Sequence, residues 1–194
     1  MTNKIKYLLV VLGLIIICGA VYWGIKNKVW EEQYSPLEFS LVDRGNYGVY
    51  SELLEEDMEK AGMFSVFVIE NQADWKNFWP DYIRNPNTGG FAYEPDVDFA
   101  NKIVIVMLQG VKNSGGYYMM TNGVDLGSNS IKIDLGVFEP SGEDANTQVI
   151  SSPYEIISID RRDVIDSNKM IKIFNDNNGQ LLLEKKVSDL VYKR

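Results

Sequence analysis

The side chains of this chain that could carry out chemistry are mainly carboxylates. They gather in short acidic clusters at residues 55–59, 96–98 and 143–144. Two carboxylates that face each other across a pocket can hydrolyse glycosidic bonds. The clusters therefore motivate a hypothesis of carboxylate catalysis, which would need two acids to converge in a pocket. A structure in which Glu139, Glu143 and Asp144 all point into solvent would argue against it. All of the clusters lie in hydrophilic stretches, where a solvated surface explains them without catalysis.

Histidine is absent, and the single cysteine, Cys18, lies in an apolar N-terminal segment. A serine–histidine–acid triad, a cysteine–histidine pair and a histidine-ligated metal site are therefore excluded. The chain also has no calcium-loop spacing and no glycine-rich phosphate loop that opens a helix. We predict that the protein is not an enzyme, with no catalytic residue, no metal site and no cofactor.

Three loops combine glycine, proline, serine and tyrosine, and they are candidates for a binding surface. They lie at residues 113–118, 139–143 and 151–154, each between two predicted strands. Alternate loops of a β-meander fall at one end of the sheet, so the three would form a shared rim. Ordinary turn chemistry is the competing explanation. The candidate partner-binding rim consists of Ser114, Gly115, Gly116, Tyr117, Pro140, Ser152, Pro153 and Tyr154.

The elements that must position this rim are mainly strands. The continuous apolar run at 103–108 predicts a central strand buried on both faces. The alternation of apolar and polar residues over 131–137 predicts a half-buried strand. Short connections imply antiparallel pairing in a sheet, a small sandwich or a barrel, with one or two short helices. Further strands are predicted at 64–69, 117–120, 149–150, 154–159, 170–174 and 181–184.

Aromatic residues at helical spacing predict a short helix that packs on the sheet. Trp75, Phe78, Trp79 and Tyr82 recur at the spacing of one helix face, and Asn71 is its predicted N-cap. A second short helix is predicted at residues 53–60.

Two Asn-Gly pairs and one proline predict breaks in the strands. Asn122-Gly123 and Asn178-Gly179 predict turns, the second of them in a C-terminal hairpin. Pro153 lacks an amide donor, which places its part of the chain at a sheet edge or a bulge.

The N-terminal segment predicts a membrane anchor. Residues 7–25 are uncharged and mostly apolar, and about 20 such residues cross a bilayer as a helix. We predict an anchor at 1–28 with a cytoplasmic amino terminus, a linker at 29–44, and an extracytoplasmic β-rich domain at 45–194. A signal peptide cleaved near Gly19-Ala20 and a lipoprotein signal at Cys18 are the alternatives, and both also export the domain.

The charge distribution limits the partners of the predicted domain. The net charge is −8, and residues 1–30 hold four lysines and no acid, which leaves −12 for the remainder. An acidic domain repels phosphate backbones, so we predict a protein partner and no nucleic acid.

The order of motifs resembles the PrcB C-terminal domain family, named for a subunit of a bacterial surface protease complex. It comprises the aromatic helix, Val97-Asp98-Phe99, the strand at 103–108, Ser114-Gly115-Gly116-Tyr117, Pro140 and Ser151-Ser152-Pro153-Tyr154. The similarity covers roughly residues 65–162, with Ser114 and Ser151 where the family has threonine. The resemblance implies a non-catalytic domain on a secreted or anchored protein that assembles with a protease, and it brings no catalytic residues.

A fainter likeness is to chagasin-type protease inhibitors, which use loops at the end of a β scaffold. Asn85-Pro86-Asn87-Thr88-Gly89 fits their N-P-x-T-G loop, but a helix rather than a strand is predicted before it. Inhibition through residues 85–90 or 115–118 is therefore the alternative to a membrane-anchored interaction domain.

Overall fold

The computed structural model describes residues 32–47, 64–83, 93–112, 114–140, 152–164 and 168–193. The chain divides into two compact units, Met1–Gln33 and Tyr34–Arg194. All the elements below belong to the second unit. Within the described residues, no helix is both long and apolar enough to cross a membrane. The predicted anchor at 7–25 lies outside the described residues, as do the helix predicted at 53–60 and the strand predicted at 149–150.

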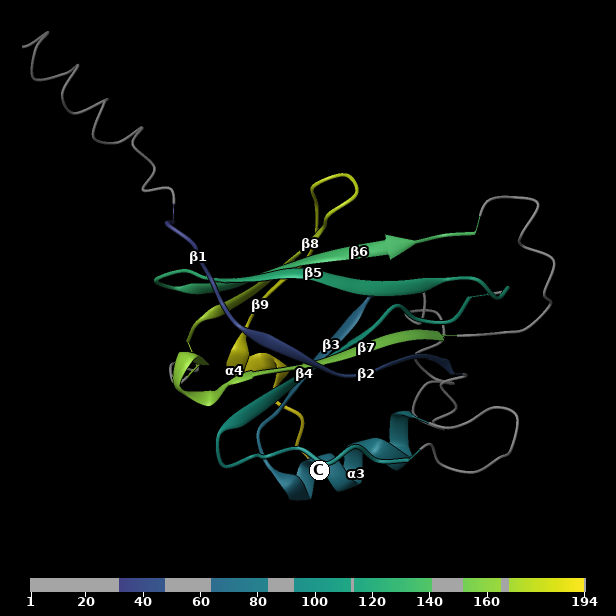
Figure 1. Ribbon diagram of the computed structural model, residues 1–194, viewed down its shortest axis with the longest axis horizontal. Coiled ribbons are helices and arrows are strands. Elements are labelled where there is room, and N and C mark those ends of the chain that lie inside the picture. Colours follow the sequence, from purple (N-terminus) through teal and green to yellow (C-terminus); the bar gives the residue numbers. More distant parts are fainter. Residues whose placement is uncertain are drawn as a thin grey trace, which may run out of the picture. The chain divides into compact units, whose positions relative to one another are not determined.

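The second unit is mainly β, as predicted, and its strands form two sheets that do not close into a barrel (Figure 1). The first sheet has the order β1-β5-β6-β8-β9 and the second β2-β7-β4-β3. The strands are β1 (Ser35–Pro36), β2 (Phe39–Tyr47), β3 (Ser65–Ile69), β4 (Lys102–Leu108), β5 (Tyr118–Leu126), β6 (Ser130–Phe138), β7 (Ser152–Asp160), β8 (Met170–Asn175) and β9 (Gln180–Lys186). The helices are α3 (Gln72–Tyr82), a 3-10 turn (Arg161–Val164) and α4 (Val187–Leu190).

Strand pairing is antiparallel except between β6 and β8, which are parallel. The prediction of purely antiparallel pairing was therefore wrong at this one position. After β6 the chain crosses to the other sheet and forms β7 before it returns as β8. Because the chain crosses between the sheets twice, β8 runs in the same direction as β6. The two strands are not joined by a short hairpin, which would make them antiparallel.

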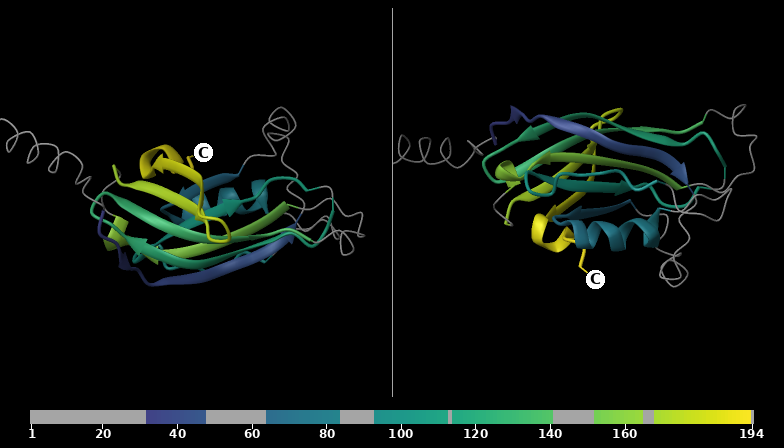
Figure 2. Two further views of the ribbon diagram at one scale, coloured as in Figure 1. Left: turned by 90° about the horizontal axis from the view of Figure 1, so that it is seen from above. Right: turned by 60° about the horizontal axis from the view of Figure 1, so that its bottom comes forward.

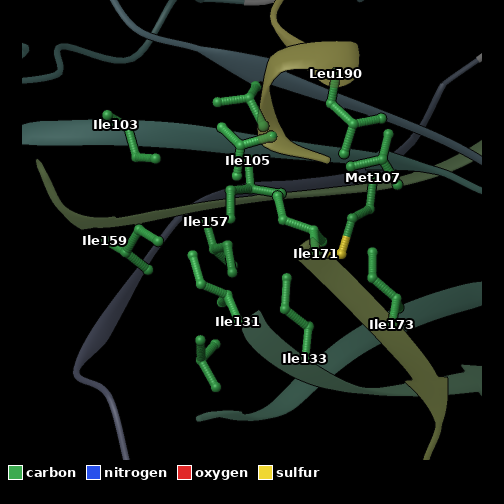
Figure 3. Packing of buried hydrophobic residues seen from close by; sticks show 14 of the residues in the cluster. Ile103, Ile105, Met107, Ile131, Ile133, Ile157, Ile159, Ile171, Ile173 and Leu190 are labelled. Carbon is green, nitrogen blue, oxygen red and sulfur yellow. The ribbon is translucent and has the colours of Figure 1, made fainter. Parts of the chain in front are cut away.

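Aliphatic side chains fill the space between the two sheets (Figure 3). Alternate residues of β4, β6, β7 and β8 point inward, because successive side chains of a strand point to opposite faces. The fully buried members include Ile105, Ile133, Ile157 and Ile171. The predicted central strand is β4, whose residues 103–108 are all buried on one face or the other.

An aromatic layer covers the outer face of the second sheet. Trp75, Phe78 and Trp79 of α3 are buried against Val104, Val106 and Ile156. The Asn71 side chain accepts a hydrogen bond from the Asp74 amide at 2.9 Å, which caps the helix as predicted. Figure 2 shows the C-terminal segment, in yellow, beside this helix. Its Tyr192 ring lies edge-on to Phe78, with ring centroids 5.3 Å apart.

One of the two turns predicted from Asn-Gly pairs was wrong, because that pair lies inside a strand. Asn122-Gly123 forms a β-bulge in β5, where the pairing with β6 shifts between Thr121 and Gly123. A bulge inserts one extra residue into a strand without reversing the chain. Asn178-Gly179 is a turn as predicted, and Gly179 has φ +70 in the β8–β9 hairpin.

Pro153 lies in β7, a central strand between β2 and β4, and not at the edge that its missing amide predicts. Its carbonyl accepts the Gln109 amide, 2.9 Å away. The amide and the carbonyl of a strand residue point toward the same neighbouring strand. The nitrogen of Pro153, which has no hydrogen to donate, therefore also faces Gln109. The β4–β7 ladder ends at Leu108 and Tyr154, one pair earlier. The proline is therefore tolerated because it lies just beyond the last ladder pair.

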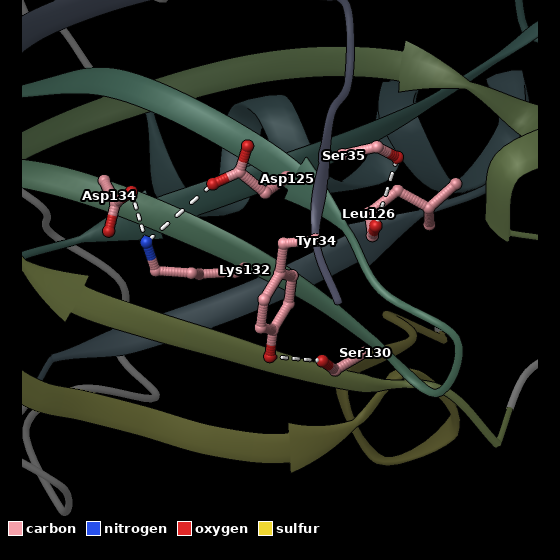
Figure 4. A network of polar contacts seen from close by, with 7 residues as sticks. All are labelled: Tyr34, Ser35, Asp125, Leu126, Ser130, Lys132 and Asp134. Carbon is pink, nitrogen blue, oxygen red and sulfur yellow. Dashed lines mark hydrogen bonds and ion pairs between the residues drawn. The ribbon is translucent and has the colours of Figure 1, made fainter. Parts of the chain in front are cut away.

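The first described residues of the second unit are fastened to the end of β5 (Figure 4). Ser35 pairs with Leu126, and the Tyr34 hydroxyl lies 2.8 Å from the Ser130 hydroxyl. The ammonium of Lys132 is 2.7 Å from Asp134 and 3.8 Å from Asp125. The contacts of Tyr34 and Ser35 hold the entry of the chain at one end of the first sheet, and the Lys132 pairs join β5 to β6 beside it.

Candidate interaction site

The predicted rim loops meet at the end of the sandwich opposite to this chain entry. Leu108, the last residue of β4, pairs with Tyr154 near the start of β7. Tyr118, the first residue of β5, pairs with Phe138, the last residue of β6. The segments that leave β4 and β6 and those that enter β5 and β7 therefore share one end. Within the described residues, the predicted rim residues divide into two groups, which we call the outer rim and the inner rim.

The outer rim consists of Ser114, Gly115, Gly116, Tyr117 and Pro140, all partly or fully exposed. Gly116 has φ +88, and a Cβ on it would lie 3.1 Å from Pro140 Cβ. Glycine at this position therefore allows both the backbone conformation and the close approach of the two loops. The Lys112 ammonium lies 5.1 Å from the Tyr117 ring centroid, within the range of a cation–π contact.

An aromatic pair that the sequence analysis missed extends the outer rim onto the first sheet. The rings of Tyr118 and Phe138 stack with centroids 4.2 Å apart and planes inclined by 8°. The Tyr118 residue is 46% exposed. Their side chains lie on the solvent face because β5 and β6 turn Met119 and Leu135 inward. The sequence feature that could have identified Tyr118 is the alternation of side chains along a strand. Tyr118 lies next to the buried Met119, so its side chain points to the opposite face.

The inner rim consists of Ser152, Pro153 and Tyr154, and it is buried. The Tyr154 residue is 1% exposed, and its hydroxyl donates a hydrogen bond of 2.7 Å to Asp43 Oδ2. A Cβ on Gly45 would lie 2.7 Å from the Tyr154 ring, so only glycine fits opposite it in β2. This tyrosine locks β7 to β2 and offers no side chain to a docking partner.

A buried glutamate next to the inner rim also escaped the sequence analysis. Glu155 is 0% exposed, and its Oε1 lies 2.7 Å from Arg44 Nη2. Its Oε2 accepts the Thr121 amide at 2.7 Å, from a strand of the other sheet. A carboxylate without such partners would be strongly destabilising in this environment. The sequence feature that could have identified Glu155 is its position as the single charged residue within the strand at 152–159.

Two β-bulges bring the partners to Glu155. The β2–β7 pairing shifts between Leu41 and Asp43, which places Arg44 opposite Glu155. The β5 bulge begins at Thr121, and a bulge interrupts the ladder locally. Because the carboxylate bonds to β2 and β5 at once, it ties the two sheets together close to the outer rim.

Of the three acids on which the carboxylate-catalysis hypothesis depends, the structure describes only Glu139. Glu139 is exposed, and Glu143 and Asp144 lie outside the described residues. Asp98 accepts a hydrogen bond from the Asn101 side chain, which lowers the pKa of its carboxyl. Asp160 forms hydrogen bonds with Arg162, and these lower the pKa of that carboxyl. Among the described residues, no group of three or more acids or cysteines could hold a metal ion.

The fold and rim define a two-sheet, mainly β domain with an exposed loop end. Residues 103–160 match the family model described as PrcB C-terminal, which confirms the family resemblance predicted from the order of motifs. The matched segment covers β4 to β7, the strands whose ends form the rim. No curated protein and no solved structure matches the chain. The loop at 85–90, which resembles the chagasin loop, lies outside the described residues.

Proposed function

We propose that this chain is a non-catalytic, membrane-anchored protein-interaction subunit, an accessory component of an extracytoplasmic protease complex. The observation that carries the proposal is the coincidence of two features. The family match spans β4 to β7, and the outer rim lies at the shared end of those strands. The family description supports a role alongside a protease, and the outer rim is an exposed part of the matched segment and its immediate surroundings.

The composition of the outer rim suits protein recognition. Aromatic residues are enriched where protein partners bind, because they bury a large area at a low cost in side-chain entropy. Tyr118 and Phe138 are already stacked on each other. The pair is therefore ordered before a partner arrives, which lowers the entropy lost on binding.

The attachment point of the N-terminal segment also favours this role. The described chain enters the domain beside Leu126, the last residue of β5, whereas Tyr118 at the rim is the first. These two residues are the ends of a nine-residue strand, which spans roughly 25–30 Å at about 3.3 Å per residue. The point where Tyr34 enters the domain and the rim therefore lie at opposite ends of β5.

Site-specific photo-crosslinking tests this proposal. A photoreactive phenylalanine analogue replaces Tyr118 in the full chain, which is expressed in its native cells and crosslinked in their membranes. Tyr93 is the matched control, since it is 86% exposed and lies next to Glu94, which bonds to Gln72 of α3. We expect one dominant protein adduct from position 118, containing a protease subunit, and none of this product from position 93. Equal adducts from both positions, or none, would refute an interaction through the rim.

Protease inhibition is the alternative use of the same surface. Residues 115–118 lie in the outer rim and at the start of β5, where a rigid scaffold presents them to solvent. Titration against cysteine and serine proteases separates the two functions. An accessory subunit leaves substrate turnover intact in the complex, whereas an inhibitor abolishes turnover at micromolar concentration.

A further inference from the structure

Polar side chains lie between the two sheets at the rim end of the sandwich. Glu155 is one of them, and it bonds to Arg44 and to the Thr121 amide. Gln109 is another, because it lies two positions after Met107 and such residues face the same side of a strand. Met107 belongs to the aliphatic core between the sheets (Figure 3). We call Arg44, Gln109, Thr121 and Glu155 the polar layer.

The members of the polar layer lie within reach of one another. The Gln109 amide donates to the Pro153 carbonyl at 2.9 Å, so Gln109 lies diagonally across from Glu155, two residues further along β7. Diagonal neighbours on one face of an antiparallel pair are about 7–8 Å apart, a distance that long side chains bridge. Thr121 faces the same space from the other sheet, since it pairs with Leu135 of the aliphatic core. The Gln109 and Thr121 side chains therefore both lie next to Glu155.

Two side-chain oxygens of this layer need a hydrogen-bond partner. Gln109 and Thr121 are each 7% exposed. In the described part of the chain, neither Gln109 Oε1 nor Thr121 Oγ1 forms a hydrogen bond. Burying a polar group without a partner is costly, and buried polar groups of native proteins nearly always have one. The two oxygens therefore indicate a bound group enclosed by the layer.

The chemistry of the layer identifies this group. An amide oxygen only accepts hydrogen bonds, whereas a hydroxyl both donates and accepts, so the group must donate to Gln109. A cation is disfavoured because the charges of Glu155 and Arg44 already cancel, and a further buried charge would be unpaired. Thr121 has a shorter side chain than Leu135, its partner in β6, so the group must be small. A water molecule is the small, neutral donor and acceptor that meets all three conditions.

We propose that the polar layer encloses one structural water molecule. The water donates to Gln109 Oε1 and to the Glu155 carboxylate, and it accepts from the Thr121 hydroxyl. A carboxylate has about four acceptor sites, so Glu155 keeps capacity beyond its bonds to Arg44 and Thr121. About three hydrogen bonds are typical of a buried water. The water completes a network that joins β2, β5, β7 and the end of β4, and its test does not depend on the proposed function.

A crystal structure of the full chain that resolves solvent tests the proposal directly. We expect one solvent peak within about 2.5–3.0 Å of Gln109 Oε1, Thr121 Oγ1 and a Glu155 carboxylate oxygen. Thr121→Val should lose this peak, whereas Thr121→Ser keeps the hydroxyl and should retain it. The proposal is overturned if the wild type has no such peak, if Gln109 and Thr121 bond directly to each other, or if the peak persists in Thr121→Val.

Denaturant unfolding of the full chain in detergent micelles adds a test by sign. Thr121→Val should lower the folding equilibrium constant about tenfold, the effect of one lost hydrogen bond. A hydroxyl without a partner would give the opposite result, because a methyl group in its place relieves the cost of burial. An increase in the folding constant would therefore overturn the proposal.

A double-mutant cycle tests whether one water serves both side chains. Gln109→Met should also lower the folding constant about tenfold. The double variant with Thr121→Val should lose about tenfold rather than about a hundredfold, because either change alone releases the same water. Independent effects that multiply in the double variant would contradict a shared water.

Discussion

The inner rim and the extended outer rim each contain a tyrosine in a loop-like sequence, yet the two tyrosines have different roles. Tyr154 follows a proline in the inner rim, is 1% exposed and bonds to Asp43. Tyr118 follows the glycines of the outer rim, is 46% exposed and stacks on Phe138. One tyrosine fastens two strands, and the other faces solvent. Loop composition indicates where chains turn, but the register of the neighbouring strands decides which side chains a partner can reach.

The largest effect should follow removal of the inner tyrosine. Tyr154→Ala should lower the free energy of unfolding by about 3–5 kcal/mol, because it leaves a cavity in the aromatic layer. Tyr154→Phe keeps the ring and should lose only about 1–2 kcal/mol, from the hydrogen bond to Asp43. Denaturant unfolding of the two variants measures both values. If Tyr154→Ala unfolds like the wild type, the inner rim is not a structural element.

The glutamate beneath the rim should come next. Glu155→Ala leaves the Thr121 amide without its acceptor and Arg44 without its carboxylate, which should destabilise the fold by about 2–3 kcal/mol. Asp134→Ala is the control, since its pair with Lys132 is part-buried at the surface and should be worth at most about 1 kcal/mol. Equal losses in the two variants would argue against a special role for the buried pair.

A smaller effect is expected where the two rim loops touch. Gly116→Ala meets both a positive φ and Pro140 at 3.1 Å, whereas Gly179→Ala meets a positive φ with open space around it. The second substitution should cost about 1 kcal/mol, and the first more than that. Thermal unfolding of the two variants compares them. A cost for Gly116→Ala at or below that of Gly179→Ala would mean that the loops adjust freely.

The smallest effect on stability should come from the exposed aromatic pair. Tyr118→Ala should change the free energy of unfolding by no more than about 0.5 kcal/mol, as surface substitutions usually do. The same change should weaken binding of the partner by about 2 kcal/mol if Tyr118 is an interface hot spot. Unfolding and co-purification with the crosslinked partner provide the two readouts. A large loss of stability would make Tyr118 structural, like Tyr154.

Much of the fold could be predicted from the sequence because local patterns determined it. The apolar run at 103–108, the alternation at 131–137 and the aromatic helix with its Asn71 cap all form where predicted. Asn122-Gly123 misled the prediction, since a bulge and a turn need similar residues and only strand pairing distinguishes them. The parallel pairing of β6 with β8 depends on an intersheet crossing, which no local pattern encodes.

The candidate site could be predicted only in part, for the same reason. The sequence placed the three loops between strands, and the strand ends do bring them to one end. It could not tell which tyrosine is buried, because the fit of the Tyr154 ring over Gly45 depends on the β2–β7 register. The ion pair of Arg44 and Glu155 joins residues 111 positions apart, so no sequence spacing points to it.

Hydroxyl-radical footprinting of three tyrosines tests the central claim most directly. The modification of Tyr93, Tyr118 and Tyr154 is compared between the purified full chain and the chain in its native membranes. We predict that Tyr118 is modified in the purified chain and protected in the membranes, that Tyr93 is modified in both, and that Tyr154 is modified in neither. Equal modification of Tyr118 in both samples, or ready modification of Tyr154 in the purified chain, would contradict the division of the rim into a docking half and a structural half.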